Sequence, residues 1–175
     1  MLSEKDFFWK NFRLGTELQN SGTFIYNGIF CLDNIDYFRH EEDCFEFLYN
    51  ISVGIERLQK ILIVLLEHEN VESQEEFEKS LITHNHLELL ARIKAKYELK
   101  FGKPHNKFLG LLTNFYKTVR YERFNINSIY KPSQDKEQLV EFIMSELQVK
   151  LTEGPVNVLE NTDQVKNFLG RLIYM

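Results

Sequence analysis

Apolar residues along the chain recur at steps of three and four, which is the spacing of one face of an α-helix rather than the alternation of a strand. The clearest example predicts a long core helix from about Asp43 to His68, with Leu48, Ile51, Ile55, Leu58, Leu62 and Leu65 on one face. Gly54 within this helix costs roughly 1 kcal/mol relative to alanine, and it indicates that another backbone passes close by.

The first 40 residues predict two shorter helices. Ser3 is placed to cap the first one, which carries Phe7, Phe8, Trp9 and Phe12. The second runs from about Thr23 to His40 and carries Phe24, Ile25, Ile29, Phe30, Leu32 and Phe38. With so many large apolar side chains, we expect both helices to be largely buried.

Three helices are predicted after the core helix. Ser73 and Glu76 have capping-box spacing and open a short helix from Gln74 to Leu81. Thr83 is placed to cap the next helix, from about His84 to Phe101, which ends before Gly102 and Pro104 and buries Leu87, Leu90, Ile93 and Tyr97. A further helix from His105 to about Phe124 shows Phe108, Leu112, Phe115 and Val119 on one face.

Two helices complete the prediction. Residues 125–133 have the composition of a loop, and a helix from about Gln134 to Lys150 follows, burying Leu139, Phe142, Ile143 and Leu147. Gly154-Pro155 breaks the chain, and Asn161 is placed to cap a last helix holding Val165, Phe168, Leu169 and Leu172. Residues 1–175 are therefore predicted to form a single all-α domain, an antiparallel helical bundle of about six to eight helices.

Composition agrees with one compact domain. With 175 residues, of which 43% are hydrophobic and 27% charged, the chain can build a core without a disulfide or a metal. The longest unbroken apolar run, Ile61 to Leu66, is six residues, which excludes a membrane span, and a charged start predicts a cytoplasmic protein. Cys31 and Cys44 are isolated from each other and are expected to act as small buried apolar residues rather than as a disulfide.

Charge is distributed unevenly along the chain. Residues 91–131 hold ten basic side chains against two acidic ones, a net charge of +8, although the whole chain carries −5. Such a segment could neutralise the phosphates of a ligand. It could equally dock against acidic segments within or between chains, or remain solvated.

Several catalytic and metal-binding arrangements can be tested against the sequence. His84 and His86 stand two apart, about 200° around a helix, so they cannot share a metal ion and are expected to cap or pack. Glu72 and Glu75 match the first half of the carboxylate cage of all-α NTP pyrophosphatases, but Glu160 and Asp163 lie too far along the chain to complete it. We therefore expect no metal and no cofactor.

Three segments of the sequence resemble the all-helical HEPN superfamily (higher eukaryotes and prokaryotes nucleotide-binding). They are Gly54 to Leu66, with Glu56 and Lys60 four apart; Thr83 to Leu90, with a His-x-Leu-x-x-Leu type run near His86; and Leu112 to Asn125. The resemblance covers a core of about 43–131, on which N-terminal helices 4–40 and C-terminal helices 134–172 would pack.

This resemblance implies metal-independent RNA cleavage at a dimer interface, or nucleic-acid binding without cleavage. The nuclease motif of the family is an arginine followed, four to six residues later, by a histidine. Arg120 occupies the arginine position, but Asn125 stands where the histidine is expected. Asparagine cannot serve as a general base near neutral pH, so the resemblance implies a degenerate site, with Arg120 and Asn125 as candidate catalytic residues.

Three functions remain open. The first is binding of RNA or another phosphate ligand, without efficient cleavage, through a basic and aromatic surface of Arg120, Arg123, Lys117, Tyr116 and Tyr121. The second is a weak ribonuclease whose histidine comes from elsewhere in the chain or from a partner chain. The third is a dimeric interaction protein with no nucleic-acid ligand, in which the basic surface would be covered by a protein partner. In each case we expect a homodimer.

Overall fold

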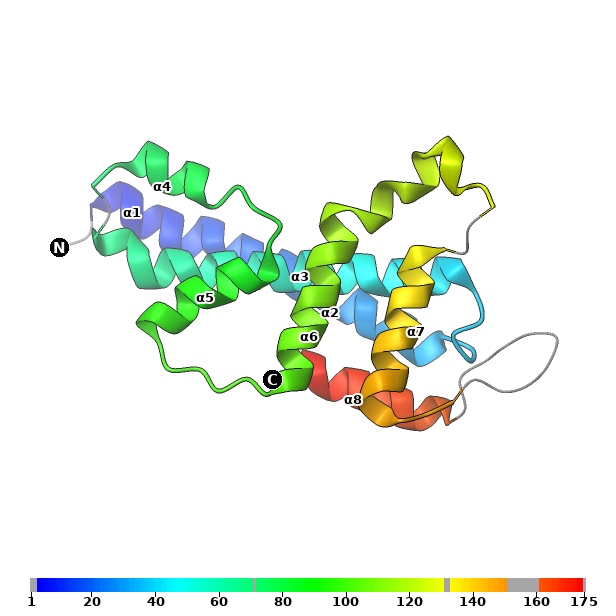
Figure 1. The fold of residues 1–175 in the computed structure, drawn as a ribbon. Coiled ribbons are helices and arrows are strands. Elements are labelled where there is room, and N and C mark those ends of the chain that lie inside the picture. The colour runs from blue at the N-terminus through cyan, green and yellow to red at the C-terminus, as the bar shows by residue number, and fades with distance from the viewer. Residues whose placement is uncertain (1–2, 71, 131–132, 151–160, 175) are drawn as a thin grey trace.

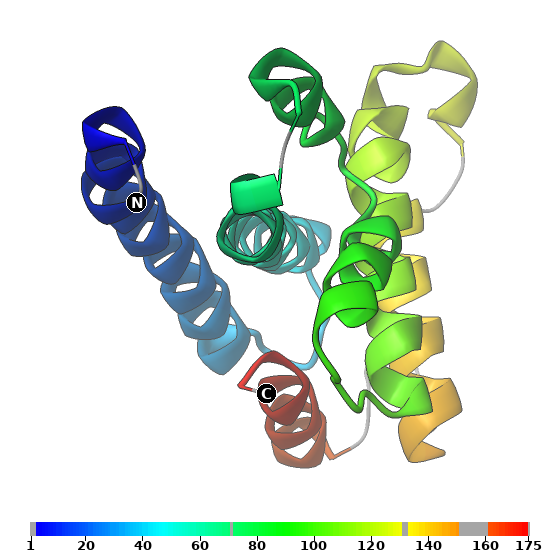
Figure 2. The ribbon, with the colours of Figure 1, turned by 90° about the vertical axis from the view of Figure 1, so that its left-hand side faces the viewer.

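The computed structural model describes residues 3–70, 72–130, 133–150 and 161–174, and these residues contain helices and no strands. Helix α3 (Glu41–Glu67) lies between two layers (Figures 1 and 2). On one side is α2 (Leu14–Asn34), and on the other are α5 (His86–Lys96), α6 (Lys103–Lys117) and α7 (Gln134–Leu147). The predicted all-α bundle is confirmed for the described residues.

The N-terminal residues form one long helix instead of the predicted two. Helix α1 (Glu4–Phe8) continues through a π-helical turn, η1 (Trp9–Arg13), directly into α2, and residues 35–40 are not helical. The predicted start is confirmed, because Ser3 forms a capping box with Asp6.

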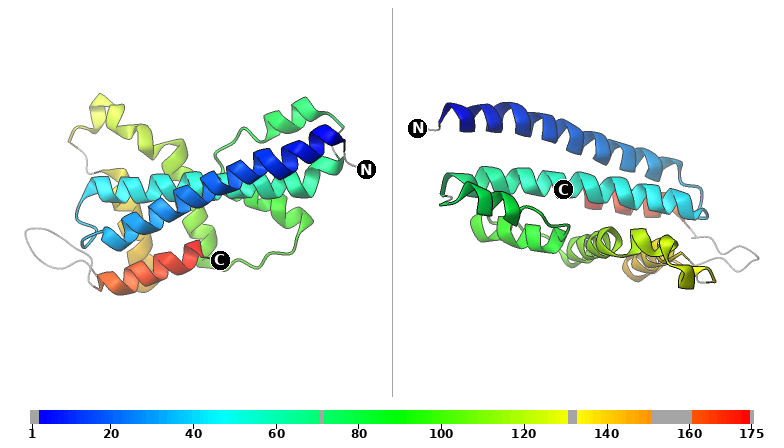
Figure 3. Two further views of the ribbon diagram at one scale, coloured as in Figure 1. Left: turned by 180° about the vertical axis from the view of Figure 1, so that it is seen from behind. Right: turned by 90° about the horizontal axis from the view of Figure 1, so that it is seen from above.

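Burial of this long helix is confirmed on one face only. Leu14 and Leu32 are buried against the rest of the protein, as is Phe38 just beyond the helix. The outward face is exposed, contrary to the prediction, and carries Phe7, Phe8, Phe12, Tyr26 and Phe30. The reason is the position of the helix at the edge of the molecule, where α3 covers only its inner side (Figure 3).

Helix α3 begins and ends close to its predicted bounds. Leu48 and Ile51 are buried as expected, but Leu62 and Leu65 are exposed and Ile61 and Val64 are buried in their place. Gly54 lies against α2, where the Ser21 hydroxyl donates a hydrogen bond to the Gly54 carbonyl at 2.7 Å, so the predicted close approach of a second backbone is confirmed.

The middle of the chain departs from the prediction at its boundaries. Ser73 caps α4 (Gln74–Ser80) as expected, by accepting a hydrogen bond from the Glu76 amide. Helix α5 is shorter than predicted, because Asn85, not Thr83, caps it and because it ends at Lys96. Tyr97 therefore lies outside the helix and is exposed. Leu87, within the helix, was predicted to be buried and is exposed as well. An extended connection then leads to α6, which begins two residues earlier than expected.

The last elements close the lower and right-hand side of the bundle as seen in Figure 1. The short helices η3 (Val119–Phe124) and η4 (Ile126–Ser128) precede α7, and α8 (Thr162–Ile173) lies beside α2 and α6. Asn161 has a positive φ of 57° and its side chain caps nothing, so that predicted cap is wrong. The predicted break at Gly154-Pro155 lies outside the described residues.

The main core lies between α3, α6, α7 and α8, and it contains the predicted residues Phe108, Leu112, Phe115, Val119, Leu139, Phe142, Ile143, Val165 and Leu169. Both cysteines are free thiols; Cys44 is completely buried, as predicted, and Cys31 is half-buried. In the part of the chain that is described, no helix is both long and apolar enough to cross a membrane.

Candidate functional site

Four polar side chains from three separate segments meet at the middle of α3. Glu56 and Lys60 lie one turn apart on this helix. His84 comes from the extended connection between α4 and α5, and Tyr116 comes from the last turn of α6. A fifth side chain, Arg120 in η3, follows Tyr116 by four residues and packs its guanidinium over the Tyr116 ring.

Glu56 is the centre of this group. It is only 7% exposed, and its two oxygens have different partners. Oε1 accepts a hydrogen bond from Lys60 Nζ at 2.6 Å, and Oε2 lies 2.9 Å from His84 Nδ1. A buried carboxylate is costly unless it is paired, so these two contacts stabilise both the charge on Glu56 and the orientation of the His84 ring.

His84 has one ring nitrogen engaged and one left over. Its side chain is 46% exposed, and because Nδ1 faces Glu56, Nε2 is the nitrogen left to contact a ligand. The connection that carries it is fixed by a cap: Asn85 Oδ1 accepts a hydrogen bond from the Glu88 amide, and the Asn85 amide donates to Thr83 Oγ1. This geometry holds His84 over α3.

His86 has a different, structural role. It is completely buried, with Nε2 2.9 Å from the Ser52 carbonyl oxygen and Nδ1 3.4 Å from Thr113 Oγ1. Burial lowers the pKa of His86, so the ring is neutral in the native protein at pH 7. Packing is the role predicted for it, whereas His84 makes a polar contact that the sequence analysis did not predict.

Arg120 is held between two tyrosine rings. Its guanidinium carbon lies 3.7 Å from the centroid of the Tyr116 ring and 4.5 Å from that of Tyr121, which are cation–π distances. Arg120 forms no ion pair with any described residue, and its Nε is buried without a hydrogen-bond partner. Burial raises the pKa of Tyr116, so its hydroxyl stays protonated at neutral pH.

The Tyr116 ring joins Arg120 to His84. The centroids of the Tyr116 and His84 rings are 4.7 Å apart, and the Tyr49 ring stacks on Tyr116 at 6.2 Å. A cleft of about 380 Å³ opens beside this group, between α2, α3 and the connection that carries His84; its polar wall is formed by Glu17, Glu56, Arg57, Lys60, His84 and Tyr116. Arg57 is paired with Glu17 and Lys60 with Glu56, so both cations in this wall already have an acidic partner.

The other predicted site residues have different surroundings. Arg123 donates to Asp135 Oδ2 at 3.0 Å and lies 3.8 Å from Glu41, so it links η3 to the starts of α7 and α3. Asn125 Oδ1 accepts a hydrogen bond from the Asn127 amide and is used in a local turn. Lys117 is exposed at the end of α6, where its charge complements the helix dipole.

Several charges of the basic segment 91–131 are neutralised within the chain. Arg92 pairs with Glu67 on α3 at 2.6 Å, Lys107 pairs with Glu146 on α7 at 2.5 Å, and Arg123 pairs with Asp135. Intramolecular docking, one of the predicted explanations, thus accounts for part of the charge asymmetry. Among the described residues Arg120 and Lys117 have no such acidic partner.

The sequence analysis named Arg120, Tyr116, Tyr121 and Lys117 as candidates, and it did not predict the contact of His84 with Glu56. Glu56 itself could have indicated such a contact, because it is a carboxylate on a core helix, where burial is expected and a buried carboxylate needs partners. No group of three or more histidine, cysteine or acidic side chains suited to a metal occurs within residues 3–70, 72–130, 133–150 and 161–174. Comparison with family models, with curated proteins and with solved structures finds no match for this chain.

Proposed function

We propose that the protein binds single-stranded RNA, or another phosphate ligand of the same kind, at the surface formed by Arg120, Tyr116, Tyr121 and Lys117. The observation that carries the proposal is Arg120, which is stacked between two tyrosine rings and has no carboxylate partner among the described residues. The Nε of this guanidinium is buried, and its two terminal NH2 groups are the donors left for two hydrogen bonds to a phosphate.

Neighbouring residues supply the remaining interactions that an RNA strand needs. The Tyr121 ring is more than half exposed and offers a face on which a base can stack. Lys117 is exposed one turn from Arg120 and adds a second positive charge for the next phosphate. Arg123 is excluded from this surface because it is engaged with Asp135, and it serves to position η3.

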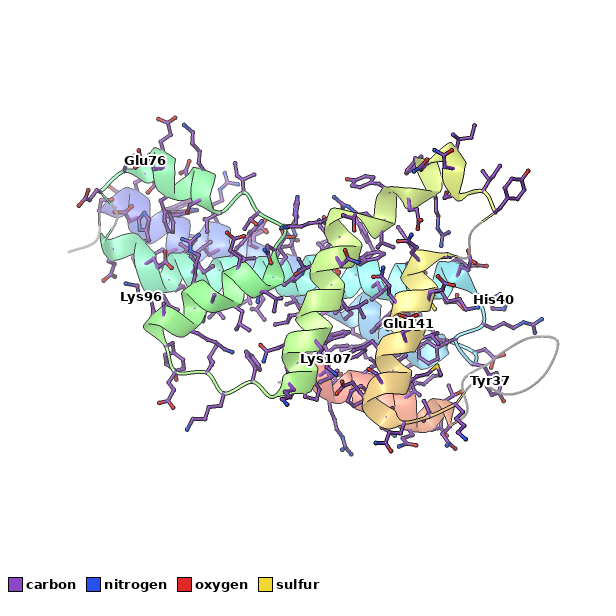
Figure 4. The ribbon with its side chains drawn as sticks, in the orientation of Figure 1. Tyr37, His40, Glu76, Lys96, Lys107 and Glu141 are labelled. Atoms are coloured by element: carbon purple, nitrogen blue, oxygen red, sulfur yellow. The ribbon has the colours of Figure 1, made fainter. Side chains whose placement is uncertain are left out.

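The test is fluorescence-anisotropy binding of a labelled single-stranded RNA to wild-type protein and to Arg120→Ala. Arg120→Ala should weaken binding about tenfold and reduce the slope of log affinity against log salt by about 0.7 between about 50 and 200 mM salt. Lys96→Ala is the matched control. It removes one charge of the same basic segment at the far end of α5 (Figure 4), and binding should change little. No binding at low salt, or equal losses in both variants, would overturn the proposal.

Cleavage of RNA is a second candidate, favoured by the contact of His84 with Glu56. In this reaction His84 Nε2 takes the proton of a ribose 2′-hydroxyl, and the 2′-oxygen forms a bond to the adjacent phosphorus while Arg120 stabilises the developing charge. The bond from phosphorus to the 5′-oxygen breaks and that oxygen takes a proton from water. The products are a 2′,3′-cyclic phosphate and a 5′-hydroxyl, and His84 returns its proton to solvent.

Cleavage and binding are separable by experiment. If the second candidate is correct, incubation with RNA gives products that end in a cyclic phosphate, and a strand with 2′-deoxyribose at the cleaved position stays intact. His84→Ala should abolish cleavage while RNA affinity remains within about threefold of wild type, because the phosphate contact is made by Arg120. Intact RNA after incubation with wild-type protein would remove cleavage and leave the binding proposal standing.

The homodimer is also part of this proposal, and its contact surface is the outward face of α1 and α2. Two pairs of exposed aromatic rings lie at its ends: Phe8 with Phe12, at a centroid distance of 4.6 Å, and Tyr26 with Phe30, at 6.5 Å. Between the pairs lie Gly15 and Gly22, where an added Cβ would meet no atom within 4 Å.

These positions are nearly symmetric about residue 19, which favours a second copy as the occupant of this surface. In an antiparallel, two-fold contact, Phe12 faces Tyr26 of the partner subunit and Gly15 faces Gly22 of the partner subunit. The glycines let the two backbones approach, and the aromatic pairs bury their faces. Charge agrees with this direction, since exposed Lys5 at one end of the helix faces exposed Asp33 of the partner subunit.

Sedimentation velocity tests the dimer. The wild-type protein should sediment as a dimer at micromolar concentration, and Tyr26→Glu should sediment as a monomer with unchanged helicity. Tyr97→Glu, at an exposed tyrosine after α5, is the matched control and should remain a dimer. A monomeric wild-type protein, or a dimer that persists in Tyr26→Glu, would contradict this contact surface.

A further inference from the structure

The short helices η3 and η4 form a protruding corner of the molecule. They stand at the upper right of Figure 1, beyond the adjoining ends of α6 and α7. Residues 124–130 at this corner, called the apolar tip below, carry four large apolar side chains that are between 64% and 94% exposed, namely Phe124, Ile126, Ile129 and Tyr130. Side chains this exposed add almost nothing to the stability of the fold, so their clustering indicates a binding surface.

Hydrogen bonds within this corner give the tip a defined shape. The Ser128 amide donates to the Asn125 carbonyl at 2.9 Å, and the Ser128 hydroxyl lies 2.7 Å from the same carbonyl oxygen and 3.0 Å from that of Glu122. Asn125 Oδ1 accepts a hydrogen bond from the Asn127 amide at 3.0 Å. The polar groups of the tip therefore have partners of their own, while its apolar side chains are left facing outward.

Charge changes sharply at the base of the tip. Residues 124–130 contain no acidic or basic side chain, whereas Lys117 and Arg120 precede them and have no acidic partner among the described residues. The guanidinium of Arg120 packs on the ring of Tyr121, with its carbon 4.5 Å from the ring centroid, and so lies beside the start of the tip. The surface therefore presents an uncharged apolar end with positive charge behind it.

An anionic phospholipid bilayer has the complementary arrangement, with a negatively charged surface above an apolar interior. A fluid bilayer also accepts side chains that project separately, whereas a folded protein would need a matching pocket for each. Polar groups that enter a bilayer need hydrogen-bond partners, and the bonds of Asn125 and Ser128 supply them within the tip. RNA fits the tip less well, because Ile126 and Ile129 have no ring on which a base can stack.

We propose that the apolar tip inserts into the interface of an anionic phospholipid membrane. Its four apolar side chains lie among the headgroups and the upper acyl chains, and Arg120 and Lys117 contact the lipid phosphates. This attachment is peripheral and uses no membrane-spanning helix. The inference does not rest on RNA binding, because residues 124–130 take no part in the proposed RNA surface. Arg120 belongs to both surfaces, so RNA and membrane should compete for it.

Cosedimentation of the full chain with lipid vesicles tests the proposal. Wild-type protein should bind phosphatidylcholine vesicles that contain about 30% phosphatidylserine at least about tenfold more tightly than vesicles of phosphatidylcholine alone, because two cations face the anionic surface. Phe124→Ser and Ile126→Ser should each weaken binding to the anionic vesicles about fivefold to tenfold, because each removes an inserted apolar side chain. Ile82→Ser is the matched control, since Ile82 is 81% exposed between α4 and α5, and its affinity should equal that of wild type.

Two tryptophan variants give readouts that misfolding would not produce. Ile126→Trp should strengthen binding to the anionic vesicles about threefold, because tryptophan favours the membrane interface. In Tyr130→Trp, the new indole should emit at shorter wavelength when these vesicles are added, and lipids with brominated acyl chains should quench it. Wild-type emission should change little, because the single tryptophan of the chain, Trp9, lies in η1, which follows α1 at the other end of the molecule (Figure 1).

Each contrary result identifies a different error. Wild-type protein that does not bind the anionic vesicles would overturn the proposal, and equal losses in Ile126→Ser and Ile82→Ser would overturn the role of the tip. Equal binding to both kinds of vesicle would overturn the anionic class of lipid. A dimeric wild type that becomes monomeric in Phe124→Ser would assign the tip to a contact between two copies instead. RNA affinity should be unchanged in Phe124→Ser, and vesicle binding by a protein that binds no RNA would leave this inference standing, so the two failures are distinguishable.

Discussion

Replacing Gly54 by alanine tests how tightly α2 and α3 are packed. An alanine Cβ at this position would lie 2.6 Å from Ile25 Cγ1, 3.0 Å from the Ile25 amide nitrogen and 3.2 Å from the Ser21 carbonyl oxygen. The Ile25 side chain can rotate away, but the two backbone atoms can move only if α2 moves. That movement would also lengthen the hydrogen bond from Ser21 Oγ to the Gly54 carbonyl, now 2.7 Å.

The expected change in the free energy of unfolding is the sum of opposing effects. Alanine is favoured over glycine in a helix by about 1 kcal/mol. Overpacking a well-packed contact costs about 1–3 kcal/mol, and weakening the buried Ser21 hydrogen bond costs about 1 kcal/mol. Gly54→Ala should therefore be destabilised by about 1–3 kcal/mol, and a chain of this size should lose about 2–4 °C in Tm for each kcal/mol.

Urea unfolding followed by far-UV circular dichroism, at one fixed protein concentration, measures this difference. The matched control is Gly170→Ala in α8, where an added Cβ meets no atom within 4 Å and only the helix preference acts. That variant should be more stable than wild type by about 0.5–1 kcal/mol. If Gly54→Ala is as stable as Gly170→Ala, then α2 can withdraw from α3 at no cost and the reasoning is refuted.

Three further predictions follow from buried ionisable groups. Because burial lowers the pKa of His86, the unfolded chain binds a proton below about pH 6.5 that the native chain excludes. The free energy of unfolding should therefore be highest above about pH 6.5 and fall by up to about 1.4 kcal/mol per pH unit below it. Urea denaturation curves at several pH values should show a smaller slope in His86→Gln. Burial raises the pKa of Cys44 to about 12 and that of Cys31 to about 11, so mass spectrometry should find slow alkylation of both thiols at neutral pH, with Cys44 modified only as fast as the protein unfolds. Arg123→Met should cost about 2 kcal/mol in urea unfolding by leaving the buried Asp135 carboxylate without its cation, and the loss should shrink when Asp135→Asn is added.

The features predicted correctly from the sequence are those with a local cause. The bounds of α3 agree with an apolar repeat that runs from Leu48 to Leu65, about five helical turns, and the caps at Ser3 and Ser73 follow from residues three positions apart. The close approach at Gly54 could also be predicted, because a glycine in the middle of a strongly apolar helix needs a packing reason. In each case the physical determinant lies within a few residues.

The errors concern which element covers which face. Periodicity shows that Leu62 and Leu65 share a face with Leu48 and Ile51, but it does not show where the neighbouring helices end. The core helices cover Leu48 and Ile51. Further along the same face, Leu58 and Leu62 border an apolar hollow between α3, α5, α6 and α8, and Leu65 is exposed to solvent. The aromatic face of α1 and α2 is exposed for the same reason, because an apolar face indicates that something should cover it and does not identify the covering surface.

The contact between His84 and Glu56 shows where a functional prediction could have gone further. The two residues are 28 positions apart, and His84 lies in an irregular connection whose path depends on the Asn85 cap and on the buried His86, so no repeat in the sequence indicates their pairing. Glu56, however, belongs to a core helix in which burial is expected, and a buried carboxylate requires positive or hydrogen-bonding partners. Lys60, one turn away, satisfies one oxygen and leaves the other to be satisfied from outside the helix. Many basic and hydrogen-bonding side chains of this sequence could do so, and His84, just before a helix packed on α3, is the one that does. A buried acid on a core helix, followed through to both of its oxygens, is therefore the feature of this sequence that points to the site.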